Sequence, residues 1–105
     1  MNAVATAERT FEVDGQNIEC RFYRPEPDGQ DFRCAYEIDW PEGQRKRRAF
    51  GVDAVRALLL AMQAAHTDLL AARENHGRQI LWLENRSLGL PVAKAISDWA
   101  SDNEF

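Results

Sequence analysis

The stretch EGQRKRRAFGVDAV, residues 42 to 55, contains the point at which a strand pattern gives way to a helix pattern. Before it, apolar residues alternate with polar ones, and after it they recur every three or four positions. It also holds four consecutive cations, residues 45 to 48, in a chain whose formal net charge is −4. These cations form either a nucleic-acid-binding patch or one strand of a sheet whose neighbours supply carboxylates.

The residues near the N-terminus predict an antiparallel hairpin. Asp14-Gly15 lies between two runs of alternating polarity, and this dipeptide favours a two-residue turn in which both residues have positive φ. The turn places Phe11 opposite Ile18, so that the two side chains share a face of the sheet, as directly opposed residues must. The pattern therefore fixes both the hairpin and its register.

A third strand, FRCAYEIDW at 32–40, has the clearest alternation in the chain. A loop symmetric about Pro27 would pair it with the preceding strand so that Cys20 faces Cys34 on the core side. A reduced pair of buried thiols is the expectation there, because disulfides are rare in the cytosol.

We interpret the four cations as the fourth strand of this meander. A tight turn after Trp40 would return them along the third strand, and opposite charges on neighbouring strands attract. One register places Arg45 and Arg47 on the open face of the sheet beside carboxylates. A shift of one residue would instead place Lys46 and Arg48 beside these carboxylates on the open face. The two registers are Asp39 near Arg45 with Glu37 near Arg47, and Asp39 near Lys46 with Glu37 near Arg48.

Residues 53–76 predict one long helix of ~36 Å at 1.5 Å per residue. Asp53 is the expected N-cap and Gly77 the expected C-terminal stop. Leu60 falls on the polar side, where it has no obvious role in the core. The apolar side is predicted to contain Val55, Leu58, Leu59, Met62, Leu69 and Leu70.

The rest of the chain predicts a short fifth strand within RQILWLEN, residues 78 to 85, and a C-terminal helix that begins near Pro91. The expected fold class is α+β, an antiparallel four-stranded meander with one long helix packed on one face. We expect a single domain over 1–105, made of the strand meander (6–52), the long helix (53–76), and the short strand with the terminal helix (78–101).

The composition limits the classes of function. With 45% hydrophobic and 29% charged residues, the chain is typical of a globular protein. Its longest apolar run, ALLLAM, is far shorter than the ~20 residues of a membrane helix. The N-terminus does not resemble a signal peptide, which predicts a cytoplasmic location. The two cysteines and two histidines do not have zinc-site spacing, so we expect no metal and no cofactor.

The junction AFGVDAVRALLLAMQAA, followed downstream by LWL and LGLP, resembles a family of short bacterial proteins that is catalogued as a domain of unknown function. The resemblance covers roughly residues 10 to 91 and rests mainly on Phe50-Gly51, Asp53, Trp82 and the turn at 89–91. It implies a bacterial origin and the fold described above. It implies no catalytic residues.

Two alternatives assign the chain a chemical or nucleic-acid function. Binding of nucleic acid through Arg45–Arg48 is disfavoured, because the rest of the chain carries a formal charge of −8 once the +4 of this run is removed. An enzymatic or small-molecule site would use Cys20, Cys34 or His66. No catalytic motif accompanies these side chains, and His66 lies on the apolar side of the helix.

The favoured hypothesis is a non-catalytic protein-interaction or assembly module. Its partner would be another protein, as for an immunity protein that neutralises a basic toxin, or a second copy of the chain. Exposed apolar and aromatic side chains are often the anchors of such interfaces. The candidate interaction residues are Leu60, Trp82 and Trp99, together with Arg45, Lys46, Arg47 and Arg48.

Overall fold

The computed structural model describes residues 5–101 and residue 103. Its fold is α+β, as predicted, with one long helix packed on an antiparallel sheet. The elements are β1 (Ala7–Val13), β2 (Gln16–Phe22), β3 (Glu26–Asp28), β4 (Asp31–Trp40), β5 (Gly43–Gly51), α1 (Ala54–His76), β6 (Ile80–Leu81) and the 3-10 helix η1 (Lys94–Ala100).

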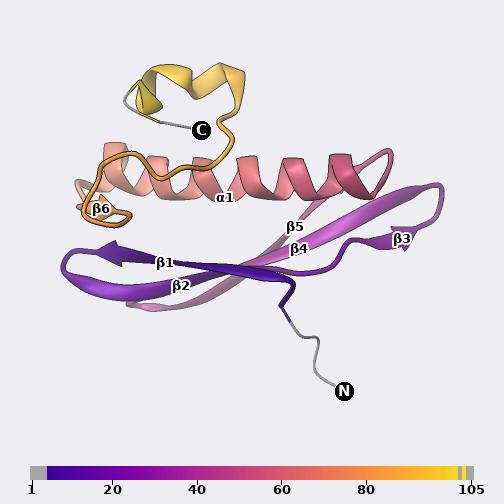
Figure 1. The fold of residues 1–105 in the computed structure, drawn as a ribbon, viewed down its shortest axis with the longest axis horizontal. Coiled ribbons are helices and arrows are strands. Elements are labelled where there is room, and N and C mark those ends of the chain that lie inside the picture. The colour runs from indigo at the N-terminus through magenta and orange to yellow at the C-terminus, as the bar shows by residue number, and fades with distance from the viewer. Residues whose placement is uncertain (1–4, 102, 104–105) are drawn as a thin grey trace.

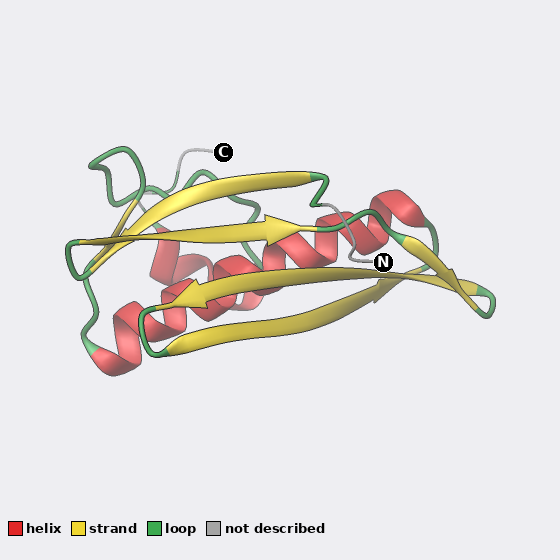
Figure 2. Ribbon diagram, turned by 90° about the horizontal axis from the view of Figure 1, so that it is seen from below, coloured by secondary structure: helices red, strands yellow, loops and turns green. Residues whose placement is uncertain are grey.

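The elements form three layers. Figure 1 shows the sheet, α1 lying across one of its faces, and η1 on the side of α1 that is turned away from the sheet. In Figure 2, the sheet is seen from below, and none of the described elements covers this second face of the long strands. The core therefore lies between the sheet and α1, and the other face of the sheet is open.

The long strand β4 has neighbours along both edges. β3 pairs with its residues 31–33 and β2 with its residues 36–38, so β3 and β2 lie end to end on the same edge. β5 pairs with β4 over 32–40 on the opposite edge. At the other side of the sheet, β1 lies between β2 and the predicted short strand β6. Among the described residues, β5 is thus an edge strand.

The hairpin of β1 and β2 confirms the predicted register. Asp14 and Gly15 have φ values of 51° and 85°, as a two-residue turn with positive φ at both positions requires. Phe11 is paired with Ile18, and both side chains are buried against α1. The turn is also held from a distance, because the Asp14 carboxylate accepts a hydrogen bond of 2.8 Å from the backbone N–H of Gln79.

The predicted pairing of the second and third long strands was wrong by four residues. Cys20 lies opposite Ile38, so it does not face Cys34. The reason is β3, since residues 26–28 were expected to be a loop but form a strand in which Pro27 pairs with Phe32. This extra strand occupies the first part of β4. A shift of four residues preserves the faces, so both thiols are nevertheless buried.

Both predicted registers of the basic strand were also wrong. The two-residue turn at 41–42 pairs Trp40 with Gly43, which places Glu37 opposite Lys46 and Asp39 opposite Gln44. The register therefore differs by one residue from the nearer of the two expectations. A shift of one residue exchanges the faces of a strand. As a result, Arg45 and Arg47 lie on the helix side of β5 instead of on the open face.

The long helix has the predicted ends but a different buried side. Asp53 accepts a hydrogen bond of 2.8 Å from the backbone N–H of Arg56, and Gly77 has a left-handed φ of 64°. The fully buried stripe consists of small residues four positions apart and is completed by two leucines. Val55 was expected in the core but is 77% exposed. The fully buried apolar residues of α1 are Ala57, Ala61, Ala65, Leu69 and Leu70.

The C-terminal helix begins later than predicted. Pro91 is buried and lies in an extended segment, and η1 starts at Lys94 as a 3-10 helix with a kink at Ile96. The segment before it contributes the buried side chains of Leu88 and Leu90 to the core. Large side chains on the sheet complete the core, namely Phe11, Val13, Ile18, Phe22, Tyr36 and Ile38.

Candidate functional site

The strand β5 presents an exposed line of positive charge at one edge of the sheet. We call Arg45, Lys46, Arg47 and Arg48 the basic edge; all four side chains are exposed. Among the described residues, β5 pairs only with β4, so the outer edge of its backbone has no strand beside it. Cationic side chains and an open line of backbone groups therefore occupy the same place in the fold.

The cations of the basic edge lie on both faces of the sheet. Arg47 lies on the helix side, where its Nη1 is 2.9 Å from the Asp68 carboxylate of α1. The same carboxylate accepts a hydrogen bond of 2.6 Å from the Tyr36 hydroxyl. Burial, followed by this hydrogen bond to Asp68, raises the pKa of Tyr36. Arg47 is thus anchored to the helix through a partly buried carboxylate.

The other three cations of the basic edge have no carboxylate within 4 Å among the described residues. Lys46 instead stands over the ring of Tyr23, with its Nζ 4.9 Å from the ring centroid. The cross-strand neighbours of Arg45 and Arg48 are Ile38 and Ala35, which carry no charge. Among the described residues, these three cations therefore form no salt bridge, although Glu37, which accepts hydrogen bonds from Arg21 and Tyr23, lies opposite Lys46 across the two strands.

The carboxylates that were predicted to pair with the basic edge serve another strand. Asp39 accepts a hydrogen bond of 2.5 Å from Arg21 of β2 and one of 3.0 Å from Gln44. The hydrogen bond from Arg21 holds the pKa of Asp39 below its usual range. Glu37 is buried and accepts hydrogen bonds from Tyr23 and Arg21. The predicted ion pairs across β4 and β5 were therefore wrong.

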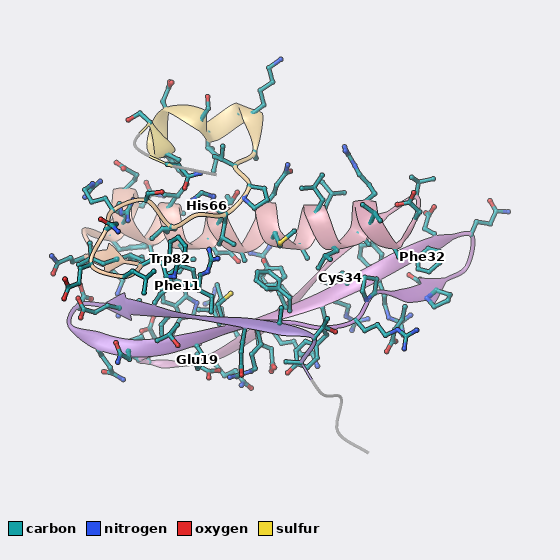
Figure 3. The ribbon with its side chains drawn as sticks, viewed as in Figure 1. Phe11, Glu19, Phe32, Cys34, His66 and Trp82 are labelled. Carbon is teal, nitrogen blue, oxygen red and sulfur yellow. The ribbon has the colours of Figure 1, made fainter. Side chains whose placement is uncertain are left out.

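A hollow of about 410 Å³ lies on the open face of the sheet, next to the basic edge. Arg33 on its wall is held by Glu26, at 3.0 Å, and by Asp28, at 3.7 Å, both on β3. The other half of the open face is acidic, and Glu19 of β2 points away from α1 there (Figure 3). The hollow is lined by Tyr23, Arg24, Glu26, Arg33, Ala35, Lys46 and Arg48.

Exposed apolar side chains follow directly after the basic edge. Phe50 is 53% exposed and shares the open face of β5 with Lys46 and Arg48. Val52 and Val55, at the junction between β5 and α1, are 73% and 77% exposed. Large exposed hydrophobic groups beside unneutralised charge are typical of binding surfaces.

The other predicted interaction residues lie elsewhere and are partly buried. Leu60 is half-buried on α1. Trp82 packs beneath the guanidinium of Arg9, which stands 3.8 Å from the ring centroid, and Trp99 packs against the core. Figure 3 shows Trp82 between α1 and the sheet, near Phe11. The structure therefore does not bring these three residues together with the basic edge.

A larger cleft of about 550 Å³ lies between the second half of α1 and the turns of the sheet. Its charges are mostly satisfied within the protein. Arg78 is 3.1 Å from Asp14 and 2.9 Å from Glu42, and its guanidinium stands 5.5 Å from the ring centroid of Trp40. Arg45 also lines this cleft, so the basic edge borders a hollow on each side of the sheet.

The candidate nucleophiles are placed poorly for catalysis. Cys20 and Cys34 are both reduced and fully buried. Burial raises the pKa of Cys20 to about 12 and also raises the pKa of Cys34, so the reactive thiolate is disfavoured at neutral pH. Among residues 5–101 and 103, no three His, Cys, Asp or Glu side chains gather as a group that could hold a metal ion.

His66 is fully buried on the side of α1 that faces the C-terminal segment (Figure 3). Its Nδ1 is 2.9 Å from the carbonyl oxygen of Pro91, which fits an N–H donor, while Nε2 has no partner among the described groups. Burial lowers the pKa of His66, and the positive charge of Arg73 lowers it further. The imidazole is therefore a neutral structural link between α1 and the segment before η1.

We expect this link to make the protein less stable in mild acid. In the unfolded chain, His66 has the usual pKa of about 6.5. In the folded protein its pKa is lower, so it takes up a proton only at lower pH. The unfolded state thus binds more protons in this range, and the free energy of unfolding falls as the pH drops from 7 to 5. Urea unfolding at a series of pH values measures this slope.

The matched variants are His66→Asn and His76→Asn. Asparagine at 66 keeps an N–H donor for Pro91 but cannot titrate, so the slope between pH 7 and 5 should become smaller. His76 is exposed at the end of α1, so His76→Asn serves as a control for the same substitution outside the core. An unchanged slope in His66→Asn would contradict this account.

Two residues that hold α1 to its surroundings, Asp68 and Arg73, were not identified from the sequence. Asp68 binds both Tyr36 and Arg47, and it lies in the buried stripe of α1, three residues after Ala65 and four before Ala72. A carboxylate in an apolar stripe was the available sign of a polar contact with the sheet. Arg73 is buried and donates to the carbonyl oxygens of Ile80 and Arg86, and no pattern in the sequence indicated this.

The fold and the site define a small α+β protein with an open sheet face, an unpaired basic edge and no assembled catalytic group among the described residues. The chain belongs to the family described as Domain of unknown function (DUF6968), whose model matches residues 7–92. This confirms the resemblance to a domain of unknown function. The match covers the whole sheet and α1 but not η1. Searches of curated proteins and of solved structures gave no match.

In the part of the chain that the structure describes, no helix has the length and the apolar character needed to cross a membrane.

Proposed function

We propose that this protein is a non-catalytic protein-binding module that engages its partner through the basic edge. The proposal rests on the exposure of Arg45, Lys46 and Arg48 and on their lack of a nearby carboxylate. These three exposed cations lie on an edge strand and have no carboxylate within 4 Å among the described residues. Unneutralised charge at a surface directs association toward partners of opposite charge.

The exposed side chains after the basic edge support a protein as the partner. Phe50 on the open face and Val52 at the junction would bury apolar surface in a complex. Charge alone gives selectivity and fast association, whereas burial of apolar area contributes much of the binding free energy. A surface that combines both suits a protein better than a phosphate backbone.

Nucleic-acid binding has less support. The chain is acidic overall, with a formal net charge of −4, and carboxylates occupy the part of the open face formed by β1 and β2. The aromatic rings of Phe22 and Tyr36 are buried under α1, so they are not available for stacking with bases. An enzymatic function based on Cys20, Cys34 or His66 also has less support, because these side chains are fully buried and a substrate could not reach them.

The test uses the two lysines of the chain, Lys46 in the basic edge and Lys94 in η1, both of them exposed. The tagged protein, Lys46→Glu and Lys94→Glu are used to capture partners from lysate of the source cells at ~50 and ~200 mM salt. Mass spectrometry and a nucleic-acid stain identify what is retained. The same change of charge is thus made inside and outside the proposed surface.

We expect one protein to be retained in a constant ratio by the wild type and by Lys94→Glu. Its recovery with Lys46→Glu should fall about fivefold, since a cross-strand charge pair of up to ~1 kcal/mol is lost. Equal recovery by all three proteins would overturn the assignment of the basic edge. Retention of nucleic acid alone, and only at low salt, would support the alternative function instead.

A further inference from the structure

We propose that the partner contributes an acidic extended segment, which adds to the sheet as a new antiparallel strand beside β5. This inference rests on the proposed function and specifies its chemistry: main-chain hydrogen bonds supply the affinity, and carboxylates facing the basic edge supply the selectivity. Addition of a strand to an open sheet edge is a common way in which proteins bind extended peptides.

The backbone of β5 is suited to receive a strand. Its pairing with β4 is continuous from Gly43 to Gly51 without a bulge, and this stretch contains no proline. In an antiparallel ladder, alternate residues turn both N–H and C=O toward the neighbouring strand. The residues of β5 that do not bond to β4 therefore offer these groups outward. At about 3.3 Å per residue, the nine residues form an edge of ~30 Å.

The charges of β5 select what can occupy this edge. Successive side chains of a strand point to opposite faces, so an added strand meets Arg45 and Arg47 on the helix side and Lys46 and Arg48 on the open face. Like charges on directly opposed residues are unfavourable, whereas opposite charges stabilise the pair. The matching segment therefore carries carboxylates on both faces, opposite Lys46 and Arg48 on the open face and opposite Arg45 on the helix side, where Arg47 already has Asp68 as a partner.

The same charges disfavour a second copy of the chain as the occupant. Antiparallel pairing of β5 with β5 would align one basic run against the other and bring cations face to face. The basic edge thus excludes self-pairing, which is how charged edge strands avoid aggregation. An acidic segment from a different protein converts the same charges into attraction.

The exposed ring of Phe50 adds a second feature to the segment. Phe50 follows Lys46 and Arg48 on the open face, two residues apart in each case. The residue of the segment opposite Phe50 would bury it, and it lies two positions from the nearest carboxylate on that face. The segment is therefore expected to read apolar-x-acidic-x-acidic, with further acidic residues in between.

The probe is a nine-residue peptide with blocked ends, Thr-Val-Thr-Glu-Glu-Glu-Glu-Thr-Thr. In antiparallel alignment with residues 43–51, its valine lies opposite Phe50 and its four glutamates lie opposite the basic edge. Two further peptides carry N-methyl groups on alternate residues, one on the even positions and one on the odd. One of these sets faces β5 and the other faces solvent, while the charge of the peptide is unchanged.

Binding of the three peptides to the full chain is measured by calorimetry, with Lys46→Glu/Arg48→Glu and Lys94→Glu as variants. We expect the parent peptide to bind and one N-methyl peptide to lose binding, while the other keeps it. The double variant should weaken binding by about tenfold or more, because two attractive cross-strand pairs become repulsive. Lys94→Glu should bind as the wild type does. Acetylation of Lys46, relative to Lys94, should fall when the peptide is bound.

Two results would overturn strand addition. Equal binding of both N-methyl peptides would show association by charge without main-chain hydrogen bonds. If no peptide bound, the proposal that the partner contributes an acidic segment would be wrong. Tighter binding of a nine-residue single-stranded oligonucleotide than of the parent peptide would favour nucleic acid instead. A protein captured from lysate in a Lys46-dependent way, together with failure of all peptides, would overturn this inference and leave the proposed function in place.

Discussion

The variant Ala61→Leu is expected to lower the free energy of unfolding by about 3 kcal/mol, because over-packing a well-filled core has costs of this order. Ala61 is fully buried where α1 crosses the sheet, and Ala57 and Ala65 lie one turn to either side. These three methyl groups let the helix approach the strands closely. Leucine adds three carbons at the centre of this contact, so the helix must move away or the side chain must adopt a strained rotamer.

Urea unfolding followed by tryptophan fluorescence measures this effect. The matched control is Arg56→Leu, which introduces the same residue at an exposed position of the same helix. Exposed substitutions without specific contacts usually change stability by less than about 0.5 kcal/mol. If Ala61→Leu were as stable as Arg56→Leu, the close contact between α1 and the sheet would be wrong.

The variant Gly51→Ala is expected to destabilise the protein by about 2 kcal/mol, again as a case of over-packing. Gly51 ends β5 beneath the first turn of α1. A Cβ atom at this position would lie 2.4 Å from the backbone nitrogen of Ala57 and 2.7 Å from the carbonyl carbon of Arg56. Both contacts involve backbone atoms, which cannot rotate out of the way as a flexible side chain can.

The control for Gly51→Ala is Val52→Ile, which adds one carbon at the next residue. Val52 is 73% exposed, so the extra carbon meets solvent and the stability should remain close to that of the wild type. Thermal and urea unfolding of the two variants provide the comparison. A stable Gly51→Ala protein would mean that the start of α1 is not held against the end of β5.

The elements with local signals could be predicted from the sequence. Asp14-Gly15 determines a turn with positive φ, and the register of its hairpin follows because the turn contains only two residues. The two ends of α1 could also be predicted, because Asp53 acts through a hydrogen bond to a residue of the first turn and Gly77 through its own left-handed backbone conformation. Signals of this kind do not depend on the rest of the fold.

The pairing of β4 could not be predicted in the same way. Its register depends on how much of β4 is occupied by β3, and the prolines around Glu26–Asp28 indicate a loop. The turn between β4 and β5 was compatible with more than one register, because the four consecutive cations of β5 bring a positive side chain near the carboxylates of β4 in each of them. One residue of shift decided which cations face the helix.

The buried side of α1 illustrates a different limit. Periodicity of large apolar residues indicated Val55, whereas the helix buries Ala57, Ala61 and Ala65. Alanine contributes little to such a pattern, although its small size is what permits a close approach. The basic edge was recognised in the sequence as a strand, but its unneutralised charge was not, since that depends on Arg21 binding the carboxylates.

The position of β6 beside β1 has a consequence for the synthesis of the chain. β1 is made early, but Ile80, the partner of Val13, follows 67 residues later. At ~5–20 residues per second, the nascent chain spends roughly 3 to 13 seconds before β6 can pair with the end of β1, at Glu12 and Val13. Glu12 lies at this end of the strand, and a charge on an exposed strand discourages contact with other nascent chains. We expect its carboxylate to matter most during translation, before β6 pairs with β1.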